Sequence, residues 1–168
     1  MKSRLAKSLS VVGLALALAA CSSVSLDDPA AGAAGGSGGA GGASAAGVMD
    51  PFNPSSVLAT DRSVYFEFDS YSVGDQYRPL VETHARYLAA NPQQKILIEG
   101  NTDARGGAEY NLALGQRRAQ AVSSMMTLIG ARETQIETIS FGKEKPKALG
   151  DTEADYAENR RADIVYLR

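Results

Sequence analysis

An arginine lies in an unexpected position within the longest helix that the sequence predicts, over about residues 108–129. On a helical wheel of about 100° per residue with Leu114 at 0°, Arg118 falls at roughly +40° and Asn111 at roughly +60°. Both lie within the apolar stripe expected to face the core, whose other members are Ala121, Met125, Leu128 and Ile129. A charged group that faces a core needs a partner, because burying it alone costs several kcal/mol.

The candidate partner nearest in sequence is Asp103, in the loop that precedes this helix. If the loop folds over the first two helical turns, the carboxylate comes to lie beside Arg118. A cleft with one anionic and one cationic group suits a ligand that carries an ammonium and a carboxylate on one carbon, since a guanidinium donates two parallel hydrogen bonds to a carboxylate. Two other interpretations remain: a purely structural ion pair, or an arginine that extends along the helix flank to solvent.

The elements that must position this pair form an α+β pattern. Segments rich in β-branched and aromatic residues predict strands, and apolar residues at helical spacing, ended by Gly or Asn-Pro, predict helices. The predicted strands span 63–69, 95–99, 136–141 and 161–167, and the predicted helices span 79–90 and 108–129. Strands that alternate with helices favour a sheet covered on one face by two helices.

The first twenty residues have the pattern of a cleaved export signal. Three positive charges within residues 1–7 precede an apolar run at residues 9–20. This run is shorter than the ~20 apolar residues that span a bilayer. A short buried helix or a membrane anchor is the alternative interpretation.

The only cysteine, Cys21, follows this run directly, in the sequence Leu18-Ala19-Ala20-Cys21. The tetrapeptide resembles the lipobox of bacterial lipoproteins. This resemblance implies that Cys21 becomes the N-terminal residue after cleavage and carries acyl chains such as palmitate, which together anchor a protein far more firmly than one chain does. The following Ser22, in place of an aspartate, implies sorting to the outer membrane.

A segment from Pro29 to Asn53 is dominated by Gly, Ala and Ser and carries almost no charge. It cannot bury enough apolar surface to offset its chain entropy, so we expect a flexible linker. The expected organisation is therefore a signal peptide at 1–20, a lipidated N-terminus and linker at 21–59, and a folded domain at 60–168.

The composition argues against several kinds of partner. The formal net charge is −2, so the chain lacks the basic field that displaces counterions from nucleic acid. One cysteine and one histidine permit neither an intrachain disulfide nor a Cys/His metal cluster. We therefore expect no nucleic-acid partner, no cofactor and no metal.

Three groups of residues, in this order, resemble the OmpA-like C-terminal domain family, and in particular its Pal lipoproteins. They are Val64–Asp69, then Glu99–Gly106 with Asn111–Ala119, and finally Phe141–Pro146 with Asn159–Ala162. The resemblance covers about residues 60–168. It implies an α/β sandwich in which two main helices pack on a small mixed four-stranded sheet.

The resemblance also implies a ligand, the peptidoglycan stem peptide, held non-covalently at the free amino-acid end of meso-diaminopimelate. That end carries both an ammonium and a carboxylate, as the cleft described above requires. Carried over by motif, Asp103 would accept hydrogen bonds from the ammonium and Arg118 would bind the carboxylate. The other implied site residues are Phe68, Asp69, Arg105, Asn111, Leu114 and either Arg160 or, as the alternative, Arg161.

The implied function is that of an outer-membrane lipoprotein, facing the periplasm, which tethers the membrane to peptidoglycan within the Tol-Pal cell-envelope and cell-division system. Its implied protein partner is a TolB-like periplasmic protein. Two positions depart from the family, which often has His where Asn101 stands and Glu where Ala104 stands. The Ala104 difference bears on the TolB contact more than on the ligand.

Two other functions compete with this one. Asp69 and Asp103 could form the paired carboxylates of a hydrolase. Their motifs resemble binding positions, however, and the only histidine, His84, lies in a helix stripe typical of a packed core residue, so we expect no enzyme. An adaptor for a Tol-type partner, with only incidental wall contact, is compatible with the same residues.

Overall fold

The computed structural model describes residues 49–168. The predicted signal peptide, Cys21 and most of the predicted linker lie outside the described residues. Within the described residues, no helix is both long enough and apolar enough to cross a membrane.

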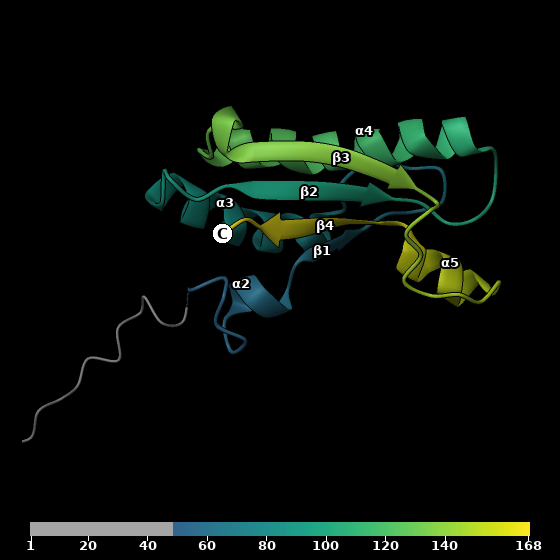
Figure 1. Ribbon diagram of the computed structural model, residues 1–168, viewed down its shortest axis with the longest axis horizontal. Coiled ribbons are helices and arrows are strands. Elements are labelled where there is room, and N and C mark those ends of the chain that lie inside the picture. The colour runs from purple at the N-terminus through teal and green to yellow at the C-terminus, as the bar shows by residue number, and fades with distance from the viewer. Residues whose placement is uncertain (1–48) are drawn as a thin grey trace, which may run out of the picture. The chain divides into compact units, whose positions relative to one another are not determined.

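A mixed sheet of four strands carries the fold, in the order β1-β4-β2-β3 (Figure 1). The strands are β1 (Ser63–Tyr65), β2 (Ile96–Asn101), β3 (Ile136–Gly142) and β4 (Arg161–Tyr166). The central β4 is antiparallel to both β1 and β2, whereas β2 and β3 are parallel. A parallel pair needs a long crossover connection, which a helix between β2 and β3 provides.

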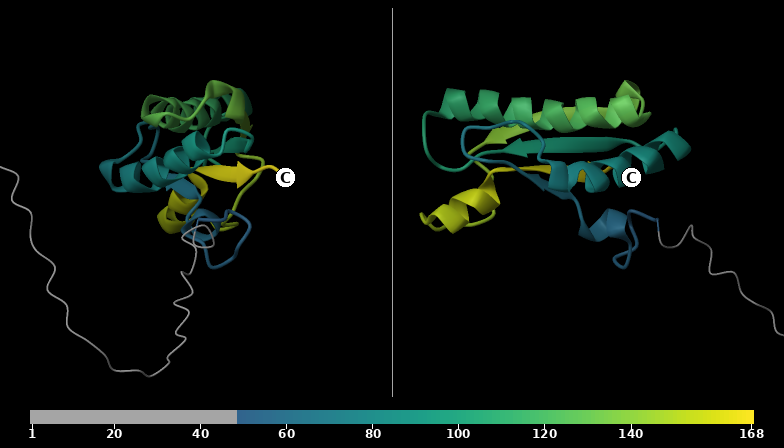
Figure 2. Two further views of the ribbon diagram at one scale, coloured as in Figure 1. Left: turned by 90° about the vertical axis from the view of Figure 1, so that its left-hand side faces the viewer. Right: turned by 180° about the vertical axis from the view of Figure 1, so that it is seen from behind.

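Two helices, α3 (Arg78–Ala90) and α4 (Ala108–Ile129), cover one face of this sheet (Figure 2). Apolar side chains from both helices and from the strands meet between these layers. Fully buried members of this core include Val81, Leu88, Ile98, Val122, Met126 and Ile164. The arrangement confirms the predicted α+β class and the two main helices on a mixed four-stranded sheet.

The helix α4 approaches the sheet closely at two glycines. A Cβ atom on Gly100 of β2 would lie 1.9 Å from the carbonyl oxygen of Gly115 in α4. A Cβ atom on Gly115 would lie 2.3 Å from the Oγ of Ser140 in β3. The absence of a side chain at both glycines lets the two backbones meet. This contact fixes the height of α4 above the sheet, and so positions Asn111 and Arg118 about one turn to either side.

The buried face of α4 differs from the predicted stripe. It includes the small residues Gly115 and Ala119 beside Leu114 and Arg118. The predicted core residue Leu128 is instead 88% exposed. The other predicted members are Ile129, which is also exposed, and Ala121 and Met125, which are half-buried. The prediction followed the large apolar side chains, whereas the small residues that permit close packing define the face.

The first strand is shorter than the predicted 63–69, because β1 ends at Tyr65. The N–H of Phe66 still donates to the carbonyl oxygen of Arg160 at 2.8 Å. The chain then turns and reaches Asp69, whose φ is 57°. A strand requires negative φ, so the left-handed Asp69 is incompatible with a continued extended chain. The turn brings Asp69 to Tyr110 in the first turn of α4.

Two short helices lie outside the predicted elements, α2 (Val57–Thr60) and α5 (Glu153–Asn159). A capping box begins α5, with the Thr152 side chain accepting from the N–H of Asp155. Leu58 of α2 is fully buried in the core. Ordered structure therefore begins a few residues before the expected boundary at residue 60.

Candidate functional site

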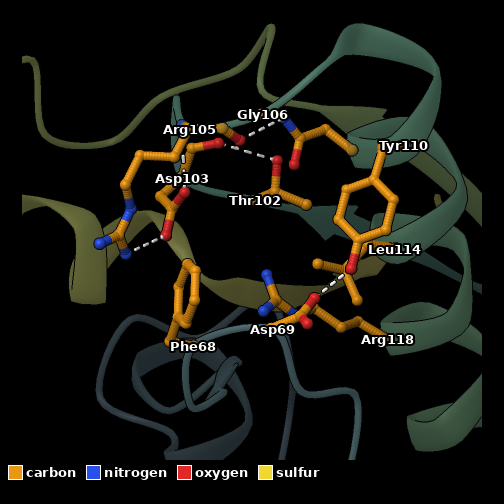
Figure 3. Close-up of a pocket in the computed structure, with 10 residues that line it drawn as sticks. Phe68, Asp69, Thr102, Asp103, Arg105, Gly106, Tyr110, Leu114 and Arg118 are labelled. Carbon is orange, nitrogen blue, oxygen red and sulfur yellow. Dashed lines mark hydrogen bonds and ion pairs between the residues drawn. The ribbon is translucent and has the colours of Figure 1, made fainter.

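A pocket opens between the turn after β1, the loop after β2 and the first turns of α4 (Figure 3). Its volume is about 230 Å³. The residues that line it are Phe68, Asp69, Thr102, Asp103, Arg105, Gly106, Tyr110, Asn111, Leu114 and Arg118. We call it the Arg118 pocket. The structure thus brings together every predicted site residue of the domain except Arg160.

Arg118 is fully buried, and backbone oxygens surround its guanidinium. Its Nε donates to the carbonyl oxygen of Ser70 at 2.8 Å, its Nη1 to that of Asn101 at 2.9 Å, and its Nη2 to that of Glu67 at 3.2 Å. The ring centroid of Phe66 lies 5.2 Å from the guanidinium carbon. Among the described residues, no carboxylate lies within ion-pair distance of this side chain.

A structural ion pair between Asp103 and Arg118, one of the interpretations that the sequence leaves open, does not form among the described residues. Both side chains line the pocket, but Asp103 pairs with Arg105 at 2.7 Å and with Arg160 at 3.4 Å. An arginine that extends to solvent is also excluded, because Arg118 is 0% exposed. The helical wheel predicts the direction in which Arg118 points. It does not predict that the turn after β1 passes beside the guanidinium and provides carbonyl oxygens as acceptors.

Both Arg118 and Asp103 are charged in this pocket. Burial lowers the pKa of Arg118 to about 10, against the attraction of Asp103, so the guanidinium stays protonated at neutral pH. Burial alone would raise the pKa of Asp103. Hydrogen bonds from the side chain and backbone of Arg105, and from Arg160, outweigh this effect and leave the Asp103 pKa below its ordinary value of 3.8. Asp103 is therefore an anion.

Arg160 supports Asp103 and does not line the pocket. Its Nη1 also donates to Glu153 at 2.8 Å, and its Nε donates to the carbonyl oxygen of Phe66 at 3.1 Å. The alternative candidate, Arg161, pairs with Asp163 at 2.9 Å. Of the two arginines, Arg160 is the one beside the site, and it acts there by holding a carboxylate in place.

Aromatic rings lie on opposite sides of the Arg118 pocket (Figure 3). On one side, the hydroxyl of Tyr110 donates to the carboxylate of Asp69. On the other, Phe68 is 60% exposed. Asn111 donates to the carbonyl oxygen of Arg105 at 2.8 Å, which ties the loop after β2 to α4.

Three lining residues, Thr102, Gly106 and Tyr110, are absent from the predicted set. Tyr110 lies four residues before Leu114, so helical periodicity places it on the same stripe and could have identified it. Gly106 has a φ of 88°, which suits glycine in the turn that leads into α4. No pattern marks Thr102 beyond its place next to Asp103.

The arrangement does not fit a wall hydrolase. A general acid needs a raised pKa, whereas the pKa of Asp103 is lowered. His84 is a packed core residue, as predicted, with Nδ1 2.8 Å from the Tyr166 hydroxyl and Nε2 2.7 Å from the carbonyl oxygen of Asp61. Among the described residues, no cluster of His, Cys, Asp and Glu could hold a metal ion.

Comparison with known proteins identifies the family. Residues 65–160 match the OmpA family. The chain belongs to the OmpA family. Relatives in this family include the peptidoglycan-associated lipoprotein of Haemophilus influenzae, 44% identical over 160 residues, which are 95% of this chain and 97% of the relative. The peptidoglycan-associated lipoprotein of Pasteurella multocida is 40% identical over 163 residues, 97% of this chain and 99% of the relative.

Solved structures of OmpA-like domains have the same fold. The crystal structure of the peptidoglycan-associated lipoprotein from Burkholderia pseudomallei is 60% identical, with a TM-score of 0.68, and the match covers 70% of this chain and 100% of that one. The C-terminal domain of Helicobacter pylori MotB is 21% identical with a TM-score of 0.59, over 63% of this chain and 84% of that one, and shows the fold alone.

These similarities confirm the predicted resemblance to the Pal lipoproteins of the OmpA family. The relatives are named for association with peptidoglycan and not for a reaction. Membership of this family therefore bears out the prediction that the chain is not an enzyme.

Proposed function

We propose that the chain is an outer-membrane lipoprotein whose OmpA domain binds peptidoglycan non-covalently, at the free amino-acid end of meso-diaminopimelate in the stem peptide. One observation carries this proposal. The buried and protonated Arg118 lines a pocket with Asp103, yet has no carboxylate partner of its own among the described residues. The names of the relatives support association with the wall.

Arg118 is suited to the carboxylate of the ligand. A guanidinium has five N–H donors. In Arg118, each of the three nitrogen atoms donates one hydrogen bond to a backbone carbonyl oxygen. Donors therefore remain for a ligand. A buried cation without a counter-ion is costly, so a carboxylate brought by the ligand stabilises it more than it would stabilise an exposed arginine.

Asp103 is suited to the ammonium. Its side chain is 6% exposed and ionised. Its Oδ1 accepts from the backbone N–H of Arg105 at 3.1 Å, and its Oδ2 accepts from the side chains of Arg105 and Arg160. A ligand ammonium would therefore compete with a side-chain donor for this carboxylate. Asn111 and Leu114 also line the pocket and would contact the carbon chain of the ligand.

The rest of the chain supplies the other end of the tether. We propose that acylated Cys21 holds the chain in the outer membrane, at its periplasmic face, while the domain holds the wall. The lipobox sequence and the lipoprotein names of the relatives support this assignment. On this view the chain joins membrane and wall within the Tol-Pal system.

A second candidate is an adaptor for a TolB-like periplasmic protein. Three aromatic side chains near the pocket are unusually exposed: Phe68 at 60%, Tyr110 at 50% and Tyr71 at 49%. Exposed aromatic residues are typical of protein-binding surfaces. Such a surface can serve a protein partner as well as the wall, so the two functions are compatible.

Sedimentation with washed peptidoglycan sacculi separates these candidates. Residues 22–168, which include the whole described core, should sediment with sacculi. Asp103→Asn removes the anion and keeps the shape, so this variant should stay in the supernatant. If the unchanged chain also stays in the supernatant, the proposal of wall binding is wrong and the adaptor function remains.

A further inference from the structure

Arg105 is paired with Asp103, the residue proposed to bind the ligand ammonium (Figure 3). Its Nη2 lies 2.7 Å from the Oδ2 of Asp103. The ring centroids of Phe68 and Tyr156 each lie 4.4 Å from its guanidinium carbon. A cation is thus held between two aromatic faces against a buried carboxylate.

A second carboxylate, Glu153 at the start of α5, contacts the same guanidinium. Its Oε2 lies 3.2 Å from the Nη1 of Arg105, and its side chain is 64% exposed, against 6% for Asp103. Arg160 joins both carboxylates, at 3.4 Å from Asp103 and 2.8 Å from Glu153. Arg105 therefore touches two alternative acceptors, one inside the pocket and one at the surface.

We propose that Arg105 is an intramolecular competitor of the ligand, which leaves Asp103 for Glu153 when an ammonium enters the pocket. This inference rests on the proposed function and adds a specificity-determining residue to it. Arg105 then sets which ligands the pocket accepts, because a ligand must bring a cation to take its place.

Exchange of one cation for another keeps Asp103 paired throughout. Loss of a cation beside this buried carboxylate would be destabilising, but the ammonium replaces the guanidinium of Arg105 while Arg160 stays at 3.4 Å. Arg105 retains Glu153 as a partner after the exchange. Its side chain is 37% exposed, and its Nε has no hydrogen-bond partner among the described residues. A short movement toward Glu153 therefore breaks its side-chain hydrogen bond to Asp103 and changes its contacts with Phe68 and Tyr156.

The exchange explains discrimination against neutral groups. A ligand with an amide in place of the ammonium brings no charge to compensate Asp103, so Arg105 keeps its place and blocks the position. Without Arg105, the entering ammonium meets less competition. Without Glu153, the displaced Arg105 loses its alternative acceptor, and displacement becomes harder.

Two variants test the competition in opposite directions. Calorimetric titration of residues 22–168 with a diaminopimelate muropeptide at fixed salt gives the Kd of each. Arg105→Gln should lower the Kd about threefold to fivefold and Glu153→Gln should raise it by a similar factor, as expected for a half-exposed ion pair. A supporting role for Arg105 alone predicts weaker binding in both variants, and that result, or no change in either, would overturn the proposal.

A matched control is Arg117→Gln, which removes the same charge from an exposed position of α4 outside the pocket and should leave the Kd unchanged. A second measurement needs no variant. Backbone amide NMR signals of Glu153 and Tyr156 should shift with ligand at the same Kd, and their constancy would also overturn the proposal. If the unchanged chain binds no muropeptide, the proposed function itself is wrong.

Discussion

Arg118 has two features that are difficult to reconcile in a folded domain, since it is fully buried and fully charged. Hydrogen bonds to carbonyl oxygens compensate part of its desolvation. These bonds also join the turn after β1 to the end of β2. The residue therefore has a structural role as well as the binding role proposed for it.

Replacement of Arg118 tests the structural role. Arg118→Ala should destabilise the fold by about 3 kcal/mol or more, because three buried or partly buried hydrogen bonds to carbonyl oxygens are lost and a cavity remains. Urea unfolding followed by circular dichroism measures this change. Arg117→Ala, the exposed neighbour, should change the free energy of unfolding by less than about 0.5 kcal/mol. Similar small effects of the two substitutions would contradict the role given to Arg118.

His84 predicts a loss of stability at mildly acidic pH. The carbonyl oxygen of Asp61 can only accept, so Nε2 carries the proton and the Tyr166 hydroxyl donates to Nδ1. Burial lowers the pKa of His84 below its ordinary 6.5, so the unfolded chain binds the proton more readily. The stabilising contribution of neutral His84 is complete above pH 6.5 and is lost as pH falls through the folded-state pKa.

Urea midpoints measure this effect. The urea concentration at the midpoint of unfolding should be lower at about pH 5.5 than at about pH 7.5. The variant His84→Gln should lose most of that difference. An equal pH dependence in the variant would assign the effect to other groups.

At the scale of residues, the sequence predicts which side chains gather but not how they pair. Asp103 and Arg118 both line the pocket, as the wheel and the loop indicate. Their actual partners are distant in sequence: Ser70 lies 48 positions from Arg118, and Arg160 lies 57 positions from Asp103. Periodicity within one helix contains no information about contacts of this range.

At the scale of elements, the close contact of α4 with the sheet determines where the pocket forms. Gly100→Ala should destabilise the fold by about 3 kcal/mol or more, because neither backbone can move away without shifting the whole helix. Gly107→Ala is the matched control, since a Cβ atom there has nothing within 4 Å. Its effect on the free energy of unfolding should stay within about 1 kcal/mol. Equal effects at both glycines, measured by denaturant unfolding, would contradict the close contact.

Local signals predict the limits of α4 well, because Gly130 ends the helix where expected, after Ile129. They fail at β1, because the aromatic pattern continues past Tyr65, where the strand ends. Nothing in that pattern indicates the left-handed backbone of Asp69. They also fail at α5, which has only seven residues. Its polar sequence shows little apolar periodicity, and the cap at Thr152 is its main signal.

At the scale of the whole molecule, the proposed tether requires an anchor and a binding domain that act independently. Cys21→Ser should prevent acylation and move the chain out of the outer-membrane fraction, because the acyl chains provide the anchor. Purified chain with this substitution should still sediment with sacculi. Cell fractionation after digestion of the wall measures the first effect. Retention of the variant in the membrane fraction would assign the anchor to another segment.

Titration with two muropeptides that differ only in the diamino acid of the stem peptide tests the central claim most directly. One carries meso-diaminopimelate, and the other carries lysine, which keeps the ammonium but lacks the second carboxylate. Residues 22–168 should bind the first peptide, and should bind the second at least about tenfold more weakly because Arg118 gains no ligand carboxylate. Equal affinity for both peptides, or affinity for neither, would contradict a pocket built from Asp103 and Arg118 for a zwitterionic group.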